Sequence, residues 1–197
     1  MGARPLVMGI LNVTPDSFAE SGSRLDPARA IDDALAIEAE GADIVDVGGE
    51  STRPGADSIP ADVEAARVLP VIQGLAGRLR VPLSIDTTKA TVARAALEAG
   101  ASIVNDISGL AYDDEMGPVV AEAGAAVVLM HMRGRPREMY AHAAYGDVVA
   151  DVSTELSAAV DRAAACGVDR GQVIVDPGIG FAKRSEHSYR VLAQLPA

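Results

Sequence analysis

The sequence of 197 residues has few aromatic side chains, a single cysteine and fewer basic than acidic residues. Aromatic residues make up 3% of the chain and tryptophan is absent, so alanine and the aliphatic residues must build the core. One cysteine excludes an internal disulfide framework and is typical of a reducing compartment, so we expect a cytoplasmic protein. The net charge of −11 argues against nucleic-acid binding, which requires a basic surface.

Long apolar runs are absent as well. None approaches the roughly 20 residues that a membrane-spanning helix needs, so no membrane association is expected. The N-terminal segment has neither the apolar stretch nor the cleavage site of a signal peptide. Hydrophobic residues nevertheless form 49% of the chain, which suits one globular domain over residues 1–197.

Short β-branched runs alternate with alanine-rich stretches of helical spacing. The runs that predict strands are 6–11, 44–47, 83–85, 103–104, 126–130 and 173–175. The stretches that predict helices are 27–40, 60–76, 89–99, 114–123, 145–166 and 185–195. Asp26 before Pro27 is typical of a helix start, whereas Pro70 should kink or break the second helix. The glycines that predict left-handed helix caps are Gly41, Gly100, Gly124 and Gly167.

Strict alternation of strand and helix predicts a parallel α/β sheet, either doubly wound or closed as a (β/α)8 TIM-type barrel. A polar residue ends or follows every strand run: Asn12, Asp46, Asp86, Asn105, His131 and Asp176. This convergence favours the barrel, because an open sheet concentrates its ligand groups at one switch point. About six of the eight β/α units are found, so the first and last strands would be edges, which a homodimer would cover.

The polar residues at the strand ends indicate what the site binds. Two carboxylates (Asp86 and Asp176) and one amide (Asn105) suit a flat heterocycle with amino and oxo groups, and Asp86 has the alternative role of a helix N-cap. We interpret His131 as a core or wall residue. The neighbouring Met130 suits the face of a flat ring. A zinc site is not expected, because no second histidine or cysteine cluster has ligand spacing. No nucleophile triad, P-loop or dinucleotide fingerprint is found, so the site should bind and orient ligands.

Two loops carry further candidate residues. In the first, residues 12–18, the turn-forming residues indicate a capped turn, while Phe18 in a polar loop favours a lid over a ligand. In the second, residues 48–55, Arg53 beside the Thr52 hydroxyl could hold a phosphate or pyrophosphate. A flexible surface loop explains the glycines of the second loop equally well.

Two longer motifs carry a resemblance to a known family. Residues 8–18 read MGILNVTPDSF and residues 46–55 read DVGGESTRPG, and these closely resemble the first two signatures of dihydropteroate synthases, a pterin-binding family. Shorter blocks follow in the family's order and spacing: residues 84–87, 104–107, 129–132 and 176–181. The resemblance runs from about Val7 to the last residue.

The resemblance implies a (β/α)8 barrel that binds 6-hydroxymethyl-7,8-dihydropterin pyrophosphate. The amine of p-aminobenzoate then displaces pyrophosphate with the help of Mg²⁺, which gives 7,8-dihydropteroate for folate biosynthesis. By resemblance, the pterin edge is bound by Asp86, Asn105 and Asp176. Its walls are then Ile107, Met130 and Phe181. Asn12 would belong to the metal and pyrophosphate site, and Thr52 and Arg53 to a loop near p-aminobenzoate and the anion. No side chain is assigned as a catalytic group.

Two departures from the family pattern bear on activity. After Phe18 the family reads Ser-Asp-Gly-Gly, whereas this chain has Ala-Glu-Ser-Gly at residues 19–22. The family's later Ser-Arg-Lys and Arg-x-His blocks, from strands seven and eight, do not occur in residues 1–197, so the domain is expected to be incomplete at its C-terminus. A pterin-binding fragment without activity is therefore one alternative. A methyltetrahydrofolate-dependent methyltransferase is another, although it does not need the pyrophosphate loop.

Overall fold

The computed structural model describes residues 4–14, 26–53 and 55–195. Within these ranges, six strands alternate with six α-helices, as the sequence predicts. The strands are β1 (Met8–Asn12), β2 (Ile44–Gly48), β3 (Leu83–Asp86), β4 (Ile103–Asp106), β5 (Ala126–Met130) and β6 (Val173–Asp176). The helices are α1 (Pro27–Ala39), α2 (Ala61–Leu75), α3 (Ala90–Glu98), α4 (Met116–Ala123), α5 (Val148–Ala165) and α6 (Ser185–Ala193). Two short 3₁₀ helices, η2 (Met139–His142) and η3 (Arg170–Gln172), precede α5 and β6.

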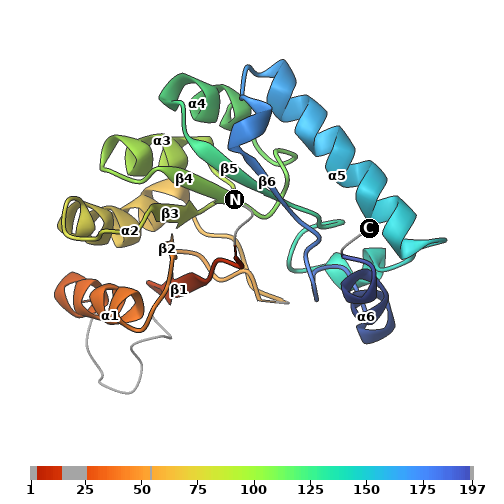
Figure 1. Ribbon diagram of the computed structural model, residues 1–197, viewed down its shortest axis with the longest axis horizontal. Coiled ribbons are helices and arrows are strands. Elements are labelled where there is room, and N and C mark those ends of the chain that lie inside the picture. Colours follow the sequence, from red (N-terminus) through yellow and green to blue (C-terminus); the bar gives the residue numbers. More distant parts are fainter. Residues whose placement is uncertain (1–3, 15–25, 54, 196–197) are drawn as a thin grey trace.

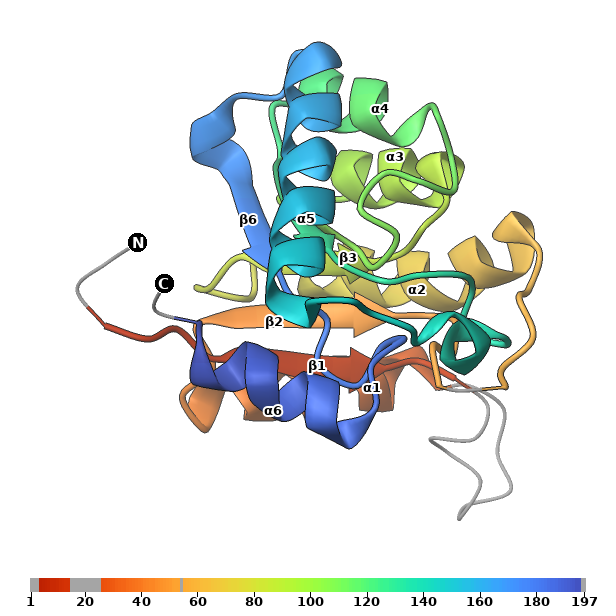
Figure 2. The same cartoon turned by 90° about the vertical axis from the view of Figure 1, so that its right-hand side faces the viewer.

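All the strands belong to one parallel sheet with the order β1-β2-β3-β4-β5-β6. Figure 1 shows the strands along the inside of an arc, with α1 to α5 on its outer side. Figure 2 shows β1 and β2 side by side and pointing the same way. A doubly wound sheet would reverse its strand order and place helices on both faces. The unreversed order and the single outer layer of helices therefore confirm the barrel-type prediction.

The helix boundaries follow from local capping. The Asp26 carboxylate accepts a hydrogen bond from the Ala28 N–H at 3.0 Å, with Pro27 in the first turn of α1. The glycines predicted as left-handed caps all have positive φ: Gly41 at 109°, Gly100 at 120°, Gly124 at 61° and Gly167 at 94°. None of the described helices, of which α5 is the longest, is long and apolar enough to cross a membrane.

Of the kink or break expected at Pro70, the break is wrong, because α2 continues through this residue to Leu75, and the kink stays a prediction. Proline removes one backbone N–H, which costs the helix a single hydrogen bond at that point. The turns around Pro70 are held by tertiary packing instead. Four of their side chains are at most 1% exposed: Val68, Val71, Ile72 and Leu75.

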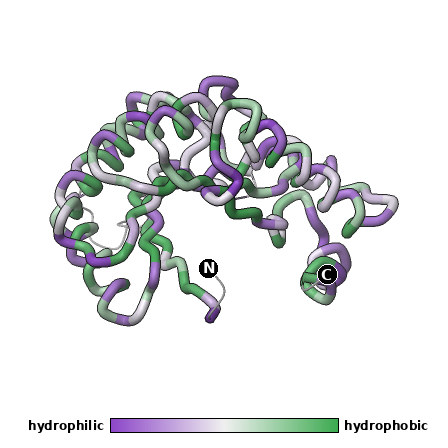
Figure 3. Tube along the Cα trace, turned by 45° about the horizontal axis from the view of Figure 1, so that its top comes forward, coloured by the Kyte–Doolittle hydropathy of each residue, from purple (hydrophilic) through white to green (hydrophobic). Residues whose placement is uncertain are grey.

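The two faces of the sheet bury different amounts of apolar surface. The outer face carries the main core, in which strand residues such as Val47, Ile85 and Leu129 pack against the helices. The inner face has a much smaller apolar cluster, centred on Ile44, Ile103 and Val128. Figure 3 shows the course of the chain as an open arc. The inner face is thus left free for polar groups toward the carboxyl ends of the strands.

Leu129→Ala tests how much the outer layer stabilises the fold. Leu129 is fully buried, whereas its cross-strand partner Val175 is 51% exposed. We expect Leu129→Ala to lower the free energy of unfolding by about 2–5 kcal/mol, through lost transfer energy and the cavity left behind. Val175→Ala is the matched control and should cost less than about 1 kcal/mol. Denaturant unfolding measures both, and equal losses would contradict the burial of Leu129 against the helices as the source of its contribution.

Candidate active site

The register of the parallel sheet brings four strand ends into one row. Across β1 to β4, Asn12 pairs with Gly48, Gly48 with Asp86, and Asp86 with Asn105. Because side chains alternate between the faces of a strand, paired positions in a row share a face. Gly48 contributes no side chain. A Cβ added there would lie 3.4 Å from Asp86 Oδ2 and 3.8 Å from Asn12 Oδ1, so both groups face the space above this glycine.

Asp46 lies one layer below this row and orients the Asn105 amide. Asn105 Nδ2 donates a hydrogen bond to Asp46 Oδ2 at 2.9 Å. Asp46 is 2% exposed, and its Oδ1 has no partner among the described residues. Burial raises the pKa of the Asp46 carboxyl, while the nearby Ser84 hydroxyl and the hydrogen bond from Asn105 act in the opposite direction. Sequence reasoning placed Asp46 at a strand end but missed this orienting role, since only the register reveals it.

Asp86 occupies a strongly acidic environment. Burial raises the pKa of its carboxyl well above the usual value, and the nearby charges of Asp46, Glu64, Asp106 and Glu50 raise it further. No hydrogen bond to the Asp86 side chain is formed within the described ranges. A ligand that brings N–H donors or positive charge would therefore favour the carboxylate form.

Asp86 is not the N-cap of the following helix, so that alternative is wrong. Helix α3 begins at Ala90, and Lys89 occupies the cap position. The carboxylate of Asp113, from the segment before α4, accepts the Ala90 N–H at 2.8 Å instead. The Asp86 carboxylate is thus left for the inner face of the sheet.

The turn after β4 places Ile107 on the wall of the site. The Asp106 carboxylate is 1% exposed and accepts three hydrogen bonds, from the Ser108 N–H, the Ser108 hydroxyl and the Leu110 N–H. Leu110 adopts a left-handed conformation with φ of 64° to close this turn. Ile107 is therefore fixed by a satisfied buried carboxylate on its N-terminal side.

The loop after β2 is anchored to α2. Lys89 forms ion pairs with Glu50 and with the buried Glu64. Gly49 lies so close to α2 that an added Cβ would be 2.7 Å from a Val68 methyl group. These contacts fix the start of the loop that carries Thr52 and the exposed Arg53.

The predicted site residues meet in one cavity of about 330 Å³ at the carboxyl ends of the strands. They are Asn12, Thr52, Arg53, Asp86, Asn105, Ile107, Met130, Asp176 and Phe181. Their individual roles stay predictions. The same cavity is also lined by Asp46 and by Ile10, a 65% exposed residue of β1, neither of which was assigned a role from the sequence. Of the first loop, residues 12–18, in which Phe18 predicts a lid, the part from residue 15 onward lies outside the described residues.

Fold and site together define a TIM-barrel-type enzyme whose cavity suits a flat ring rich in hydrogen-bond donors. A family model described as "Pterin binding enzyme" matches residues 8–197. The dihydropteroate synthase of Mycobacterium leprae is 53% identical over 191 residues, which cover 96% of this chain and 67% of that protein. The chain therefore belongs to the dihydropteroate synthase family of pterin-binding enzymes.

Solved structures of the same family superpose closely on this chain. Dihydropteroate synthase of Xanthomonas albilineans with 4-aminobenzoic acid gives a TM-score of 0.91 at 43% identity and covers 98% of this chain and 68% of that one. The same enzyme in complex with 7,8-dihydropteroate gives a TM-score of 0.86 at 39% identity, again with 98% and 68% coverage. This chain thus spans about two thirds of the length of these relatives.

Asp86→Asn tests the acidic environment through the pH dependence of stability. A carboxyl with a raised pKa in the folded state stabilises the chain at low pH, and this contribution is lost as the pH rises through that pKa. We therefore expect ligand-free Asp86→Asn to be more stable than wild type at about pH 8, with an advantage that shrinks toward about pH 4. Denaturant unfolding across this range is the measurement. The exposed Asp32→Asn should follow wild type, and an advantage independent of pH would contradict the expectation.

Proposed function

We propose that the chain acts as a dihydropteroate synthase in folate biosynthesis, with 6-hydroxymethyl-7,8-dihydropterin pyrophosphate and p-aminobenzoate as its substrates. The observation that carries this proposal is the convergence of Asp86, Asn105 and Asp176 in one cavity with Thr52 and Arg53. Family membership and relatives solved with 4-aminobenzoic acid and 7,8-dihydropteroate support it. The relatives are named as synthases, which favours this function over methyl transfer.

The residues bind and orient the substrates. The Asp86 and Asp176 carboxylates accept hydrogen bonds from the amino and ring N–H groups of the pterin, and the Asn105 amide matches its oxo edge. Ile107, Met130 and Phe181 pack against the ring faces. The p-aminobenzoate nitrogen then forms a C–N bond to the methylene carbon, while the C–O bond breaks and pyrophosphate leaves with its electron pair. The amine proton passes to solvent. Because pyrophosphate is a good leaving group, orientation and charge stabilisation are sufficient without an enzyme nucleophile.

Arg53 and Thr52 are proposed to hold the anionic groups. Arg53 is exposed at the cavity mouth, and the neighbouring Thr52 contributes a hydroxyl. A guanidinium binds phosphate oxygens in a bidentate manner, so Arg53 is suited to the departing pyrophosphate. The homodimer expected from the two sheet edges stays a prediction.

Mg²⁺ is proposed as the cofactor, with Asn12 as its protein ligand. Asn12 Oδ1 and the Asp86 carboxylate both border the space above Gly48, and oxygen donors of this kind are what Mg²⁺ prefers. The described residues hold no group of three or more His, Cys, Asp or Glu suited to a metal ion. The donor set therefore fits an ion shared with the substrate pyrophosphate, since Mg²⁺ commonly takes few protein ligands. When bound, it would offset the negative charge of the leaving group.

Turnover by residues 1–197 tests the proposal directly. The folded chain is supplied with Mg²⁺, dihydropterin pyrophosphate and p-aminobenzoate, and the release of dihydropteroate and pyrophosphate is followed. We expect both products in equal amounts. Pterin binding without product would contradict the synthase activity of this chain and support the alternative of a pterin-binding fragment.

Asp176→Asn tests the pterin-binding role of the β6 carboxylate. Asp176 Oδ1 accepts the Gly178 N–H at 2.7 Å, and asparagine keeps an oxygen for this turn while it loses the charge. We expect the affinity for the dihydropterin to fall by about 10- to 100-fold, because hydrogen bonds to a charged group contribute about 1.5–3 kcal/mol. Calorimetric titration measures it. Asp161→Asn, on the exposed surface of α5, is the control, and an unchanged affinity for Asp176→Asn would refute this assignment.

A further inference from the structure

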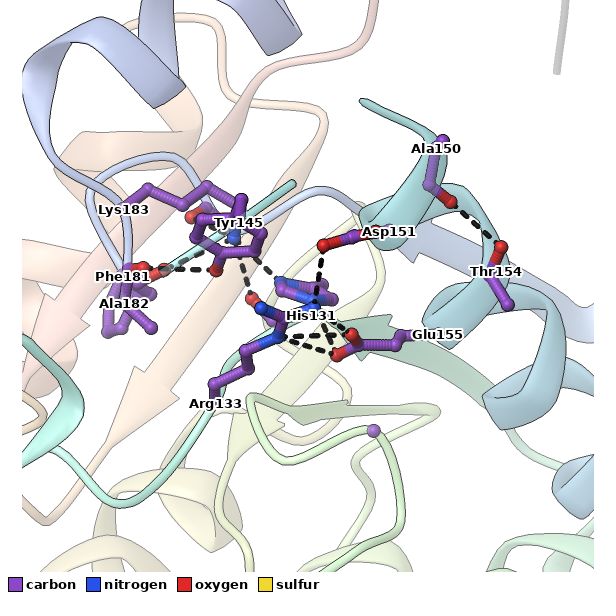
Figure 4. Close-up of polar contacts among 12 residues, drawn as sticks. His131, Arg133, Tyr145, Ala150, Asp151, Thr154, Glu155, Phe181, Ala182 and Lys183 are labelled. Carbon is purple, nitrogen blue, oxygen red and sulfur yellow. Dashed lines mark hydrogen bonds and ion pairs between the residues drawn. The ribbon is translucent and has the colours of Figure 1, made fainter. Parts of the chain in front are cut away.

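One of only two lysines in the sequence is buried beside the site without contributing to the cavity already described. Lys183 is the last residue of the loop after β6 and is 1% exposed. Its ammonium lies 2.7 Å from His131 Nδ1, 3.2 Å from the His131 carbonyl, and 3.1 Å from each of the Gly178 and Phe181 carbonyls. Figure 4 shows this ammonium between the loop and the residues after β5. The positive charge of Lys183 is thus stabilised by acceptors from two segments, the residue after β5 and the loop after β6.

The same loop is held at further points by side chains from residues 140–145. Tyr140 donates a hydrogen bond to the Gly180 carbonyl at 3.2 Å, and Tyr145 donates one to the Ala182 carbonyl at 3.0 Å. Ala182 is fully buried with a positive φ of 50°, a conformation that is unfavourable for alanine and persists only when its surroundings impose it. Gly178 lies against the His131 carbonyl, where an added Cβ would be only 2.1 Å away. The path of the loop therefore depends on tertiary contacts rather than on local preference.

His131 must be neutral for this arrangement. An ammonium group only donates, so His131 Nδ1 accepts from Lys183 and carries no proton. The ring proton then lies on Nε2, which donates to Glu155 of α5 at 2.9 Å. Arg133 contacts both Glu155 and Asp151 of α5, and its guanidinium lies 4.1 Å from the centre of the Tyr145 ring. This network assigns one tautomer to the histidine.

We propose that Lys183 and neutral His131 form a latch that positions the loop of residues 176–183 on the end of β5, and that protonation of His131 releases it. The inference rests on the proposed pterin site, because the loop begins at Asp176, the last residue of β6, and carries Phe181, while the end of β5 carries Met130. The sheet register already pairs Met130 with Asp176, so the latch sets the position of Phe181 relative to these two side chains. Lys183 is thus a positioning residue for the ring ligand, not a group that contacts it.

The charges around the latch determine the direction of its pH dependence. His131 faces Lys183 on one side and Glu155, with Arg133 and Asp151, on the other. Burial lowers the pKa of His131, the charge of Lys183 lowers it further, and Glu155 acts to raise it. Burial also lowers the pKa of Lys183 to about 8, against the opposing effects of Asp176 and Glu155. The remaining neighbours are Tyr145 and, at the edge of its ring, His187 of α6.

Acidification should therefore weaken ring binding. A protonated His131 would place two cations at hydrogen-bonding distance and remove the acceptor for Lys183. The competent state has neutral His131, so affinity falls as the pH drops through the pKa of this histidine. The protonation of Asp86 also changes with pH, so a variant is needed that removes the contribution of His131 alone to the pH dependence of binding. His131→Asn serves because its amide oxygen takes the place of Nδ1 as an acceptor and does not titrate.

The test is calorimetric titration of residues 1–197 with 6-hydroxymethyl-7,8-dihydropterin at about pH 7.5 and about pH 4.5, the lower value chosen because the pKa of His131 is lowered. At the higher pH we expect Lys183→Met to weaken binding by at least about tenfold, because four acceptors lose their shared donor. Arg190→Met removes an exposed positive charge from α6 and should bind as wild type does. Between the two pH values, His131→Asn should lose less affinity than wild type.

The outcomes separate this inference from the proposed function. If wild type does not bind the dihydropterin, the proposed function fails and the latch fails with it. If wild type binds and folded Lys183→Met binds equally well, the latch alone is overturned. The latch is also overturned if His131→Asn weakens on acidification as much as wild type. Should Lys183→Met not fold, the comparison of wild type with His131→Asn decides. Tyr145→Phe, which removes one hydrogen bond from the same loop, should then weaken binding by a smaller factor.

Discussion

The register of the parallel sheet is the constraint on which the site depends. It places Asn12, Gly48, Asp86 and Asn105 in one row, so the site residues of β1 to β4 are positioned by backbone hydrogen bonds. A slip of one residue in β3 would turn Asp86 toward the helices and Ile85 toward the cavity. Such a slip would bury a carboxylate in the apolar layer and expose a fully buried isoleucine. The same apolar packing that stabilises the fold therefore also fixes the orientation of the polar row.

The carboxylates around this row are stabilised in different ways, and the difference indicates their roles. Asp106 accepts three hydrogen bonds and shapes a turn. Asp46 accepts one from Asn105 and orients that amide. Asp86 has no hydrogen-bonding partner among the described residues, although the surrounding negative charge makes its ionised form costly. Asp106 is satisfied inside the protein and is structural, whereas Asp86 and the Asp46 Oδ1, which also has no partner among the described residues, are left for a ligand at the cavity. The unpaired Asp86 carboxylate therefore lowers the stability of the ligand-free chain and strengthens the binding of a ligand that pairs with it.

Local signals account for most of what the sequence predicted. Strands, helices and glycine caps follow from patterns within a few residues, and the parallel sheet then brings the strand-end residues together. Contacts between distant residues could not be read in this way. The Asp46–Asn105 pair joins residues 59 positions apart, and the Lys183–His131 pair joins residues 52 apart. The break expected at Pro70 and the alternative capping role of Asp86 fail for the same reason, because buried packing keeps α2 continuous and the carboxylate of the distant Asp113 accepts the Ala90 N–H at the start of α3.

The side chains on the two halves of the cavity are consequently positioned by different kinds of contact. On β1 to β4 the polar groups are in the strands themselves, and only unfolding of the sheet could move them. On the β5–β6 side, Phe181 lies in a loop whose carbonyls are bound by Lys183, Tyr140 and Tyr145. Side-chain contacts of this kind respond to protonation and to single substitutions, since each depends on one donor. The hydrogen-bonding edge of a ring ligand would then be recognised by a rigid surface, whereas the fit of its faces would depend on the buried network around His131.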